Sequence, residues 1–488
     1  MLLSEILKRI DFEECINFSE RDILGVSESS RLCKESDIFV CIKGSRYDAA
    51  SFIPEVIALG VKVIVVDKKT DNITKETTII CKNPRKTLAE ISSAIYGENL
   101  KNMKIVGITG TKGKTTTAKM LFEILGATIG KSIFIGTLGV EYKGVPKESF
   151  ITDNTTPSAP VLYKLLREAY ELGVRCAVIE VSSQALKDFR VYKIPFSVCV
   201  FTNFSPDHIG EYEHKNLGEY LDAKRRLFCD YGDVTAVVNS DDEMAEYITK
   251  GVKRKISVGT RNCDYRLEIF NSEKDSLKFA LGSVPFQISC GGDFNAKNAA
   301  LAIAAAKEIT GKKTESFRDA LKSVKVNGRY ETYESEGKRI IIDFAHNAES
   351  FKSILKNVRR ETRGRILCLF GAVGGRSFSR RKSLAAAAEA LADLLIITSD
   401  NPDFESPVEI CDEIYSYVSD KSRAVVIPDR KEAIIFGYES LTSGDTLLLL
   451  GKGHEKFQYI RGEKVAFSER EIVKSLIHKS KEKEAVTD

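Results

Sequence analysis

The sequence contains a glycine-rich segment, Gly110-Thr-Lys-Gly-Lys-Thr115, of the kind that binds phosphate groups. It follows a strand-like apolar run at 104–106 and precedes a helix-like run at 118–125. Glycines in such a segment let backbone N–H groups converge on phosphate oxygens at a helix N-terminus, while the lysine reaches the terminal phosphates and the hydroxyl can bind Mg²⁺. We therefore predict nucleotide binding through Gly110, Thr111, Lys112, Gly113, Lys114, Thr115 and Thr116.

Other polar residues follow apolar, strand-like runs. Glu180 lies in the run 177–181, and a carboxylate near a phosphate loop is a natural Mg²⁺ ligand, although it could also be a solvent-facing strand end. His208 follows the run 197–201 and is either a second site residue or a histidine that packs in its loop. Lys224 lies in the helix-like run 220–228, where spacing alone gives it no role and a surface lysine is the simple interpretation.

Strand-like and helix-like segments alternate along nearly the whole chain, which predicts an α/β fold with mainly parallel sheets. Ligands bind beyond the carboxyl ends of strands in such sheets, where these polar residues fall. The 488 residues are too many for one core, so we expect about three domains. A polar stretch at 96–102 and the segment 326–329 after an Ala-rich helix-like run place them at 1–100, 101–328 and 329–488. The strand-like runs are 61–66, 177–181, 197–201, 236–238, 339–343, 365–370, 394–398 and 446–450.

Composition excludes several classes of protein. With 73 basic and 69 acidic residues the net charge is only +4, so we expect no nucleic-acid partner. The eleven cysteines include no Cys-x-x-Cys pair, which indicates a reducing cytoplasm and no zinc site. No run approaches the roughly 18 apolar residues of a membrane helix, and no export leader is recognisable at the start of the chain, so we expect a cytoplasmic chain with no membrane partner.

Read together, the motifs closely resemble the Mur ligase family, in particular the branch that adds the third residue of the peptidoglycan stem peptide. The resemblance covers nearly the full length, and the motifs occur in the family's order. They are Gly110-Thr-Lys-Gly-Lys-Thr-Thr116, Asn154-Thr-Thr-Pro157, Glu180-Val-Ser-Ser183, Thr202-Asn-Phe-Ser-Pro-Asp-His208, Tyr220-Leu-Asp-Ala-Lys224, Asp293-Phe-Asn-Ala-Lys-Asn298, Gly328-Arg-Tyr-Glu331, Asp343-Phe-Ala-His346, Asp400-Asn-Pro402 and Gly451-Lys-Gly-His-Glu455.

The resemblance implies an N-terminal uridine-binding domain, a central P-loop ATPase domain with a parallel sheet, and a C-terminal Rossmann-like domain that holds the incoming amino acid. It makes Ser30 and Ser45 the expected contacts to the UDP end of the substrate. The residues matched to the muramoyl-dipeptide are Thr155, Thr156, Ser182 and Arg190. Asp188 stands where relatives often have Gln, which puts that contact in doubt.

The implied reaction activates the D-glutamate side-chain carboxylate of UDP-N-acetylmuramoyl-L-alanyl-D-glutamate. ATP, with Mg²⁺, would form an acyl phosphate that an amine attacks, so the enzyme mostly positions groups and neutralises charge. By resemblance, Lys114 steadies the migrating phosphoryl group, Thr115 and Glu180 hold one Mg²⁺, His208 helps with a second, and Lys224 is carbamylated. The nucleotide contacts from the middle and third domains match Asn298, Arg329 and Asp343.

The amino-acid pocket matches Arg381, Asp400, Asn401, Asp403, Gly451 and Glu455. Family members that use meso-diaminopimelate typically carry Arg at the position of Asp403, where it pairs with the distal carboxylate. A carboxylate there would attract an ammonium group, so we predict L-lysine as the free diamino acid, with L-ornithine second. Diaminopimelate remains open because Arg376 or Arg380 could supply the missing charge, and Asn-Pro-Asp is also a good turn sequence.

Two other functions stay open at this point. A folylpolyglutamate synthase-like ligase would share the ATPase and third domains, but its relatives lack the N-terminal domain that residues 1–100 match. A nucleotide-dependent switch would use the phosphate loop without needing an amino-acid pocket. We expect a monomer.

Overall fold

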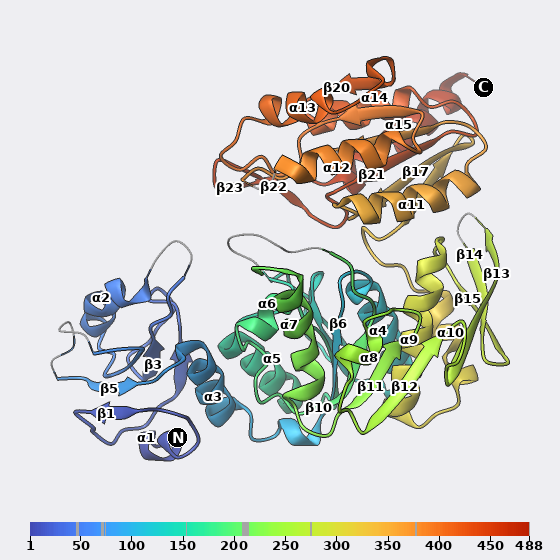
Figure 1. Cartoon of the computed structure of the whole chain (residues 1–488). Coiled ribbons are helices and arrows are strands. Elements are labelled where there is room, and N and C mark those ends of the chain that lie inside the picture. The colour runs from blue at the N-terminus through green and yellow to red at the C-terminus, as the bar shows by residue number, and fades with distance from the viewer. Residues whose placement is uncertain are drawn as a thin grey trace. The chain divides into compact units, whose positions relative to one another are not determined.

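The computed structural model describes residues 1–44, 48–69, 73, 75–152, 154–206, 214–273, 276–375 and 378–487. The chain divides into two compact units, one formed by Met1–Leu267 with Lys297–Ala320 and the other by Glu268–Ala296 with Leu321–Asp488. Strands and helices alternate through both, and most strand pairs are parallel, which confirms the predicted α/β class (Figure 1). The predicted domain boundaries stay predictions.

The first unit begins with a small sheet of strand order β1-β5-β4-β3-β2, in which only the edge strand β1 is antiparallel to its neighbour. Its strands are β1 (Glu14–Ile16), β2 (Gly25–Ser27), β3 (Asp37–Val40), β4 (Val63–Val66) and β5 (Thr77–Ile80), and its helices are α1 (Leu3–Leu7), α2 (Ile53–Ala58) and α3 (Pro84–Tyr96). Alternate residues of the strands point to opposite faces, so Ile64 packs with α2 and Val65 packs with α1 and α3. Helix α3 starts with Pro84 after the cap residue Asn83, whose side chain accepts a hydrogen bond from the Lys86 backbone.

The central sheet of the same unit places the phosphate loop in its middle. From β12 onward its strand order is β12-β11-β10-β6-β9-β7-β8, and all of these pairs are parallel except β7 with β8. The strands are β6 (Lys104–Thr109), β7 (Ser132–Gly136), β8 (Gly139–Lys143), β9 (Cys176–Glu180), β10 (Phe196–Phe201), β11 (Thr235–Asn239) and β12 (Arg254–Gly259). The helices are α4 (Lys114–Ile129), α5 (Ala159–Glu171), α6 (Ser183–Lys187), α7 (Leu217–Cys229) and α8 (Ala245–Ile248). Because β6 lies between β9 and β10, the segments after these three strands meet at one sheet edge.

Three elements carry the chain between the units: β13 (Tyr265–Glu273), α9 (Asp293–Thr310) and α10 (Arg318–Lys322). The second unit contains a hairpin of β14 (Ser276–Leu281) and β15 (Val284–Ile288) and a sheet of order β16-β17-β21-β18-β19-β20. The sheet strands are β16 (Glu331–Ser335), β17 (Lys338–Asp343), β18 (Ile366–Phe370), β19 (Leu394–Ile397), β20 (Ala424–Val426) and β21 (Thr446–Leu450). A second hairpin joins β22 (Phe457–Ile460) to β23 (Glu463–Ala466).

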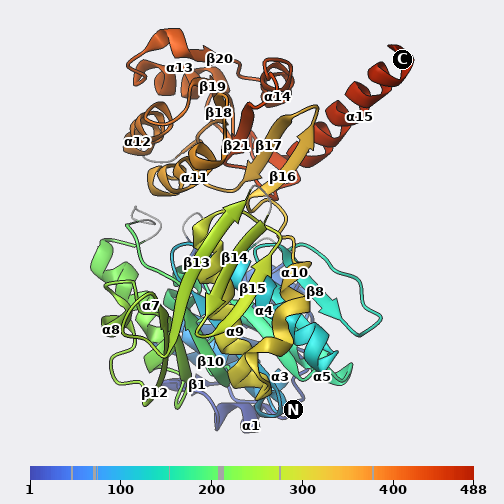
Figure 2. The ribbon, with the colours of Figure 1, turned by 90° about the vertical axis from the view of Figure 1, so that its right-hand side faces the viewer.

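Helices cover both faces of the sheet in the second unit. They are α11 (Ala348–Glu361), α12 (Phe378–Glu389), α13 (Pro407–Ser416), α14 (Arg430–Glu439) and α15 (Glu469–Thr487). Side chains such as Cys368 pack with α11, α12 and α13, while the alternate Leu367 and Leu369 pack with α14 and α15. The view in Figure 2 shows these two groups of helices on opposite sides of the sheet. Strands β17, β18, β19 and β21 are buried on both faces, which explains the continuous apolar runs in the sequence.

Each of the eight predicted strand runs overlaps an observed strand. All eleven cysteines lie in described residues and are free thiols. Across the described ranges, no helix is both long and apolar enough to cross a membrane.

Candidate active site

The phosphate loop forms the turn between β6 and α4, as predicted. Gly113 caps the helix in a left-handed conformation with a φ of 79°, and a Cβ there would lie 2.3 Å from Oδ1 of Asn298. The Lys114 Nζ donates to the carbonyl oxygens of Gly110 (2.9 Å) and Thr111 (3.1 Å). The fold thus brings Asn298 against the loop, although it lies about 185 positions further along the chain. Both the left-handed backbone and the nearby Asn298 oxygen favour glycine at position 113.

Two residues after β10 hold the phosphate loop in place. The Thr202 hydroxyl donates to the Lys112 carbonyl oxygen (2.6 Å), and the Lys112 N–H donates to Oδ1 of Asn203 (2.8 Å). The Thr111 N–H donates to the Asn203 backbone oxygen (2.8 Å). Neither residue was assigned an individual role from the sequence, although their place directly after a strand was a usable signal.

Glu180 is a fully buried carboxylate at the end of β9. Its Oε2 accepts hydrogen bonds from the hydroxyls of Thr115 (2.8 Å) and Thr137 (3.0 Å), and its Oε1 accepts one from the Thr137 N–H (2.9 Å). The Thr137 hydroxyl also lies 3.0 Å from that of Thr155. Glu180 is therefore not a solvent-facing strand end, and Thr137 is a site residue that the sequence did not reveal.

The hydroxyl of Thr115 and the carboxylate of Glu180 form a donor set of oxygen atoms that suits Mg²⁺. This ion prefers oxygen ligands and usually takes one or two carboxylates, with phosphate oxygens and waters filling the other positions. No group of three or more His, Cys, Asp or Glu side chains able to hold a metal occurs among the residues that the structure describes. Thr115 and Glu180 therefore suit an ion that binds together with a nucleotide better than one that is held by protein ligands alone.

Lys224 is buried and points at the phosphate loop from α7. Only 1% of the residue is exposed, its Nζ donates to the Gly110 carbonyl oxygen (3.0 Å), and this nitrogen lies 4.2 Å from the centre of the Tyr220 ring. The Tyr220 hydroxyl in turn lies 3.0 Å from that of Thr111. The interpretation of Lys224 as a surface lysine is therefore wrong.

The residues matched to the muramoyl-dipeptide form one hydrogen-bonded group beside Glu180. The buried Thr156 hydroxyl donates to the Glu180 backbone oxygen (2.7 Å) and accepts from the Ser182 N–H (3.1 Å). The Arg190 Nη1 donates to the Thr156 carbonyl oxygen (3.0 Å). These residues are therefore held next to the predicted metal and phosphate site.

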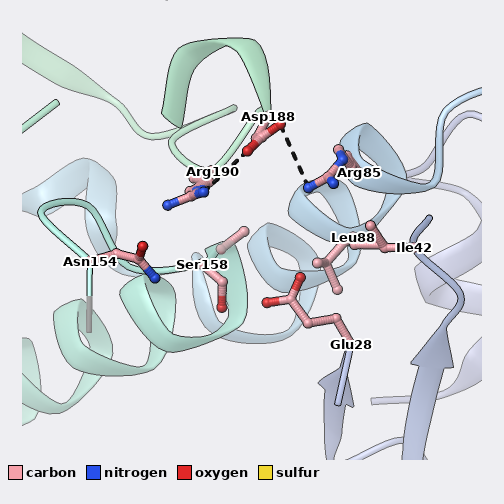
Figure 3. Close-up of a pocket in the computed structure, with 9 residues that line it drawn as sticks. Glu28, Ile42, Arg85, Leu88, Asn154, Ser158, Asp188 and Arg190 are labelled. Atoms are coloured by element: carbon pink, nitrogen blue, oxygen red, sulfur yellow. Dashed lines mark hydrogen bonds and ion pairs between the residues drawn. The ribbon is translucent and has the colours of Figure 1, made fainter. Parts of the chain in front are cut away.

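A pocket of about 120 Å³ lies beside Arg190 (Figure 3). Asp188 lies between two guanidinium groups on its wall, 3.1 Å from Nη2 of Arg190 and 3.6 Å from Nη1 of Arg85. The Arg85 Nη2 also donates to the carbonyl oxygen of Lys43 (3.2 Å). The residues that line the pocket are Glu28, Ile42, Arg85, Leu88, Asn154, Ser158, Ala159, Asp188 and Arg190.

Some of the predicted site residues lie elsewhere or are not described. Ser30 lies in the turn region after β2. Ser45, His208 and Arg376 fall outside the described residues, so their predicted roles stay predictions.

Of the two nucleotide-binding residues predicted in the second unit, Asp343 ends β17 and Arg329 lies just before β16. Asp343 Oδ2 accepts a hydrogen bond from the Tyr330 N–H (2.8 Å), and its Oδ1 accepts one from the Ala345 N–H (2.7 Å). The Arg329 guanidinium lies over the Phe344 ring, 4.4 Å from its centre. The carboxylate is thus fixed by backbone donors, and Arg329 is held close to it.

His454 is a half-buried neighbour of this pair, and it had no separate role in the sequence-based prediction. Its ring centre lies 5.0 Å from that of Phe344. Burial, and then the cations Arg329, Lys452 and Arg470, lower the pKa of His454 from 6.5 to about 3. The imidazole is therefore neutral near pH 7 and can act there only as a neutral group.

Several residues that were predicted to form the amino-acid pocket lie close together after β19 and β21. The Lys452 Nζ donates to Oδ1 of Asn401 (2.8 Å) and to Oε2 of Glu455 (2.5 Å), and the Asn401 amide donates to Oε2 of Glu455 (3.1 Å). Gly451 has a φ of 112°, and a Cβ there would lie 2.5 Å from Oδ2 of Asp400. Lys452 is fully buried and was not assigned from the sequence.

Arg381 is also buried, and it pairs with two carboxylates, those of Glu405 and Glu413. Glu405 in addition accepts a hydrogen bond from the Gly375 N–H (2.8 Å). The guanidinium is therefore oriented by acidic side chains from two other segments.

The position of Asp403 differs from the prediction, in which its carboxylate attracts the amine of the incoming amino acid. Its backbone is left-handed, with a φ of 52°, and its Oδ1 accepts a hydrogen bond from the Gly462 N–H (3.0 Å) in the turn between β22 and β23. Its N–H donates to the Tyr459 carbonyl oxygen (2.9 Å). The carboxylate thus fixes a hairpin turn, which agrees with the alternative interpretation as a turn residue.

Two family models match separate parts of the chain. The Mur ligase middle domain matches residues 108–306, and the Mur ligase, glutamate ligase domain, matches residues 328–453. The chain is 33% identical to UDP-N-acetylmuramoyl-L-alanyl-D-glutamate--2,6-diaminopimelate ligase of Aquifex aeolicus over 95% of both chains. It is 35% identical to ligase 2 of the same name from Clostridium acetobutylicum, over 98% of this chain and 100% of the relative.

The chain belongs to the Mur ligase family. As a Mur ligase it is an ATP-dependent enzyme that joins an acid to an amino acid through an amide bond, and ligases of this family use Mg²⁺ with ATP. A solved structure of a 2,6-diaminopimelate ligase is 26% identical, with a TM-score of 0.65, over 94% of this chain and 95% of that one. The MurF ligase of Thermotoga maritima in complex with ADP shares the fold, with a TM-score of 0.60 at 18% identity over 88% and 94% of the two chains.

Proposed function

We propose that this Mur ligase adds diaminopimelate to the D-glutamate of UDP-N-acetylmuramoyl-L-alanyl-D-glutamate, in peptidoglycan biosynthesis. The observation that carries this proposal is full-length similarity to relatives named for that reaction, at 33% and 35% identity. Folylpolyglutamate synthase is a weaker candidate, because such structures cover only 74% of this chain at 16% identity. A non-ligating switch would leave the Asn401, Lys452 and Glu455 group without a purpose.

Diaminopimelate replaces L-lysine as the favoured amino acid. The argument for lysine required the Asp403 carboxylate to attract an ammonium group. That carboxylate accepts a hydrogen bond from the Gly462 N–H at 3.0 Å, which gives it a role in a turn that requires no bound amine. Lysine and ornithine remain as the alternatives to be tested beside diaminopimelate.

In the proposed reaction, ATP phosphorylates the D-glutamate side-chain carboxylate, and the amine displaces phosphate from the acyl phosphate to form the amide. Lys114 steadies the transferred phosphoryl group, and Thr115 and Glu180 hold Mg²⁺, whose positive charge offsets the charge on the phosphates. By the family resemblance, Arg329 and Asp343 are proposed as further nucleotide contacts. Asp400, Asn401 and Glu455 bind the incoming amino acid.

Lys224 is proposed to act as a carbamate. A carbamylated lysine is an anion, which suits a residue directed at a site for Mg²⁺ and phosphate. Lys224→Arg keeps a cation that cannot carry this carbamate, so the variant should lose most of its activity. Mass spectrometry of the intact chain in bicarbonate buffer tests the modification, and an active Lys224→Arg variant would contradict it.

The activity test measures ADP release with ATP, Mg²⁺ and the UDP-linked dipeptide, with each diamino acid added separately. Turnover that requires both the dipeptide and an amine identifies a ligase, whereas a switch requires neither. The mass of the product identifies the amino acid.

A further inference from the structure

A fully buried ion pair lies directly beneath the predicted amino-acid pocket. Neither Arg430 nor Glu469 exposes any side-chain surface, and Nε and Nη2 of Arg430 lie 2.9 Å and 2.8 Å from Oε1 of Glu469. The two are the first residues of α14 and α15. A cation is unfavourable at the N-terminus of a helix, so helix stability does not explain an arginine at this position.

The Arg430 guanidinium also binds the chain just before both pocket motifs. Its Nη1 donates to the Ser399 carbonyl oxygen (3.0 Å), which precedes Asp400, and its Nη2 donates to the Leu450 carbonyl oxygen (2.7 Å), which precedes Gly451. The strands that lead into these motifs, β19 and β21, are not neighbours, because β18 lies between them. Sheet hydrogen bonds therefore do not fix the spacing of the two motifs directly, whereas Arg430 does.

Further contacts show that the two motifs are held as one assembly. Gln458 donates to the Asp400 carbonyl oxygen (2.8 Å) and to the Ser399 hydroxyl (3.2 Å). A Cβ on Gly451 would lie 2.5 Å from Oδ2 of Asp400 and 4.0 Å from Nη2 of Arg430. A change in the spacing would therefore move Asp400 and Gly451 relative to each other.

We propose that the Arg430–Glu469 pair positions the amino-acid pocket: Arg430 sets the distance between the Asp400-Asn401 and Gly451-Glu455 segments, and Glu469 holds its guanidinium in the required plane. Both are positioning residues, since they act through the pocket side chains. The planar fork of arginine is what allows one side chain to bind two carbonyl oxygens and a carboxylate together. The inference rests on the proposed ligase function.

The experiment replaces the whole pair by apolar residues, Arg430→Met with Glu469→Leu. Removing one partner alone would strand a buried charge and unfold the unit, whereas apolar replacement of a buried pair is often tolerated. We expect the double variant to fold, as followed by its Tm. Its KM for diaminopimelate should rise about tenfold or more, because a displacement of the pocket by about 1 Å is enough for a change of this size. The KM values for ATP and the UDP-linked dipeptide should change less than about twofold.

A second buried pair in the same unit provides the control. Arg339 and Glu361 lie 2.8 Å apart with exposed side-chain fractions of 3% and 6%, at the start of β17 and the end of α11. Arg339→Met with Glu361→Leu should lower the Tm without changing the KM for the amino acid. Arg430→Lys keeps the positive charge but loses the planar fork of the guanidinium, so it should show the same selective rise in the KM for diaminopimelate. This variant provides the test if the double variant does not fold.

An unchanged KM for diaminopimelate in either folded Arg430 variant would overturn the inference. An equal rise in the KM values for all three substrates, or the same rise in the KM for diaminopimelate in the control variant, would also overturn it. In each of these cases the unaltered chain still turns over, so the proposed function stands. Absence of turnover by the unaltered chain with any diamino acid would overturn the proposed function, and with it this inference.

Discussion

Glu180→Gln separates the structural role of this buried carboxylate from its role in catalysis. The carboxylate accepts three hydrogen bonds, two from the hydroxyls of Thr115 and Thr137 and one from the Thr137 N–H. Glutamine can keep its oxygen at the N–H, and both hydroxyls can rotate to accept from its amide group. We therefore expect unfolding free energy to fall by only about 1–3 kcal/mol, the cost of imperfectly satisfied buried polar groups.

The catalytic cost of the same change should be larger. An amide nitrogen cannot bind Mg²⁺, and loss of the negative charge removes several kcal/mol of stabilisation from the site. At about 1.36 kcal/mol for each factor of ten, kcat should fall at least about 100-fold. The assay is ADP release over a series of Mg²⁺ concentrations, with urea unfolding measured on the same samples.

Glu90→Gln is the matched control. Glu90 is a buried carboxylate in the same unit, with 2% of its side chain exposed, and it accepts a hydrogen bond from the Asp11 N–H (2.9 Å). It should lose stability and keep kcat. A Glu180→Gln variant that keeps more than about a tenth of wild-type kcat, or an equal loss of kcat in the control, would refute the assignment of Glu180 to the Mg²⁺ site.

Three further predictions follow from the geometry. Gly113→Ala should raise the KM for ATP about tenfold, because its Cβ would lie 2.3 Å from Oδ1 of Asn298 in a left-handed turn that costs about 1–2 kcal/mol for other residues; unchanged ATP kinetics would contradict this. Asp403→Asn keeps an acceptor for the Gly462 N–H and tolerates the left-handed turn, so amino-acid preference should not change, and a selective loss of lysine use would restore the charge argument. Burial disfavours the charge on Asp445, but its hydrogen bonds outweigh this and lower its pKa from 3.8 to about 2, so Asp445→Asn should cost about 2 kcal/mol at pH 7. A lowered carboxyl pKa stabilises the fold fully above the unfolded pKa, and this effect is lost as the pH falls through the folded pKa, so the difference should shrink between pH 5 and pH 2; urea unfolding across that range checks it, and a difference that is independent of pH would contradict it.

The parts of the site that could be predicted from sequence are those encoded locally. The phosphate loop needs only a strand, a few glycines and a Lys-Thr pair before a helix, and all of these are consecutive. The sheet strands were recognisable because burial on both faces requires continuous apolar runs. The amino-acid pocket around Asp400 and Glu455 was predicted from the family resemblance, and both residues follow parallel strands, where such sheets bind ligands.

The rest depends on contacts between distant segments. Thr137 has no motif around it, and its role arises only because β7 pairs with β9 and so brings it to Glu180. Asp403 looked like a charge determinant because its partner, the Gly462 N–H, lies 59 positions away in a hairpin. Nothing local in the sequence links Arg430 to Glu469.

The most direct test of the central claim measures ADP release with ATP, Mg²⁺ and UDP-N-acetylmuramoyl-L-alanyl-D-glutamate, with diaminopimelate, L-lysine or L-ornithine added separately. We predict that release requires both the dipeptide and an amine, is fastest with diaminopimelate, and yields the tripeptide product by mass. Turnover only with lysine would keep the ligase and reject the amino-acid assignment. ADP release that needs neither co-substrate would contradict the proposed ligase reaction.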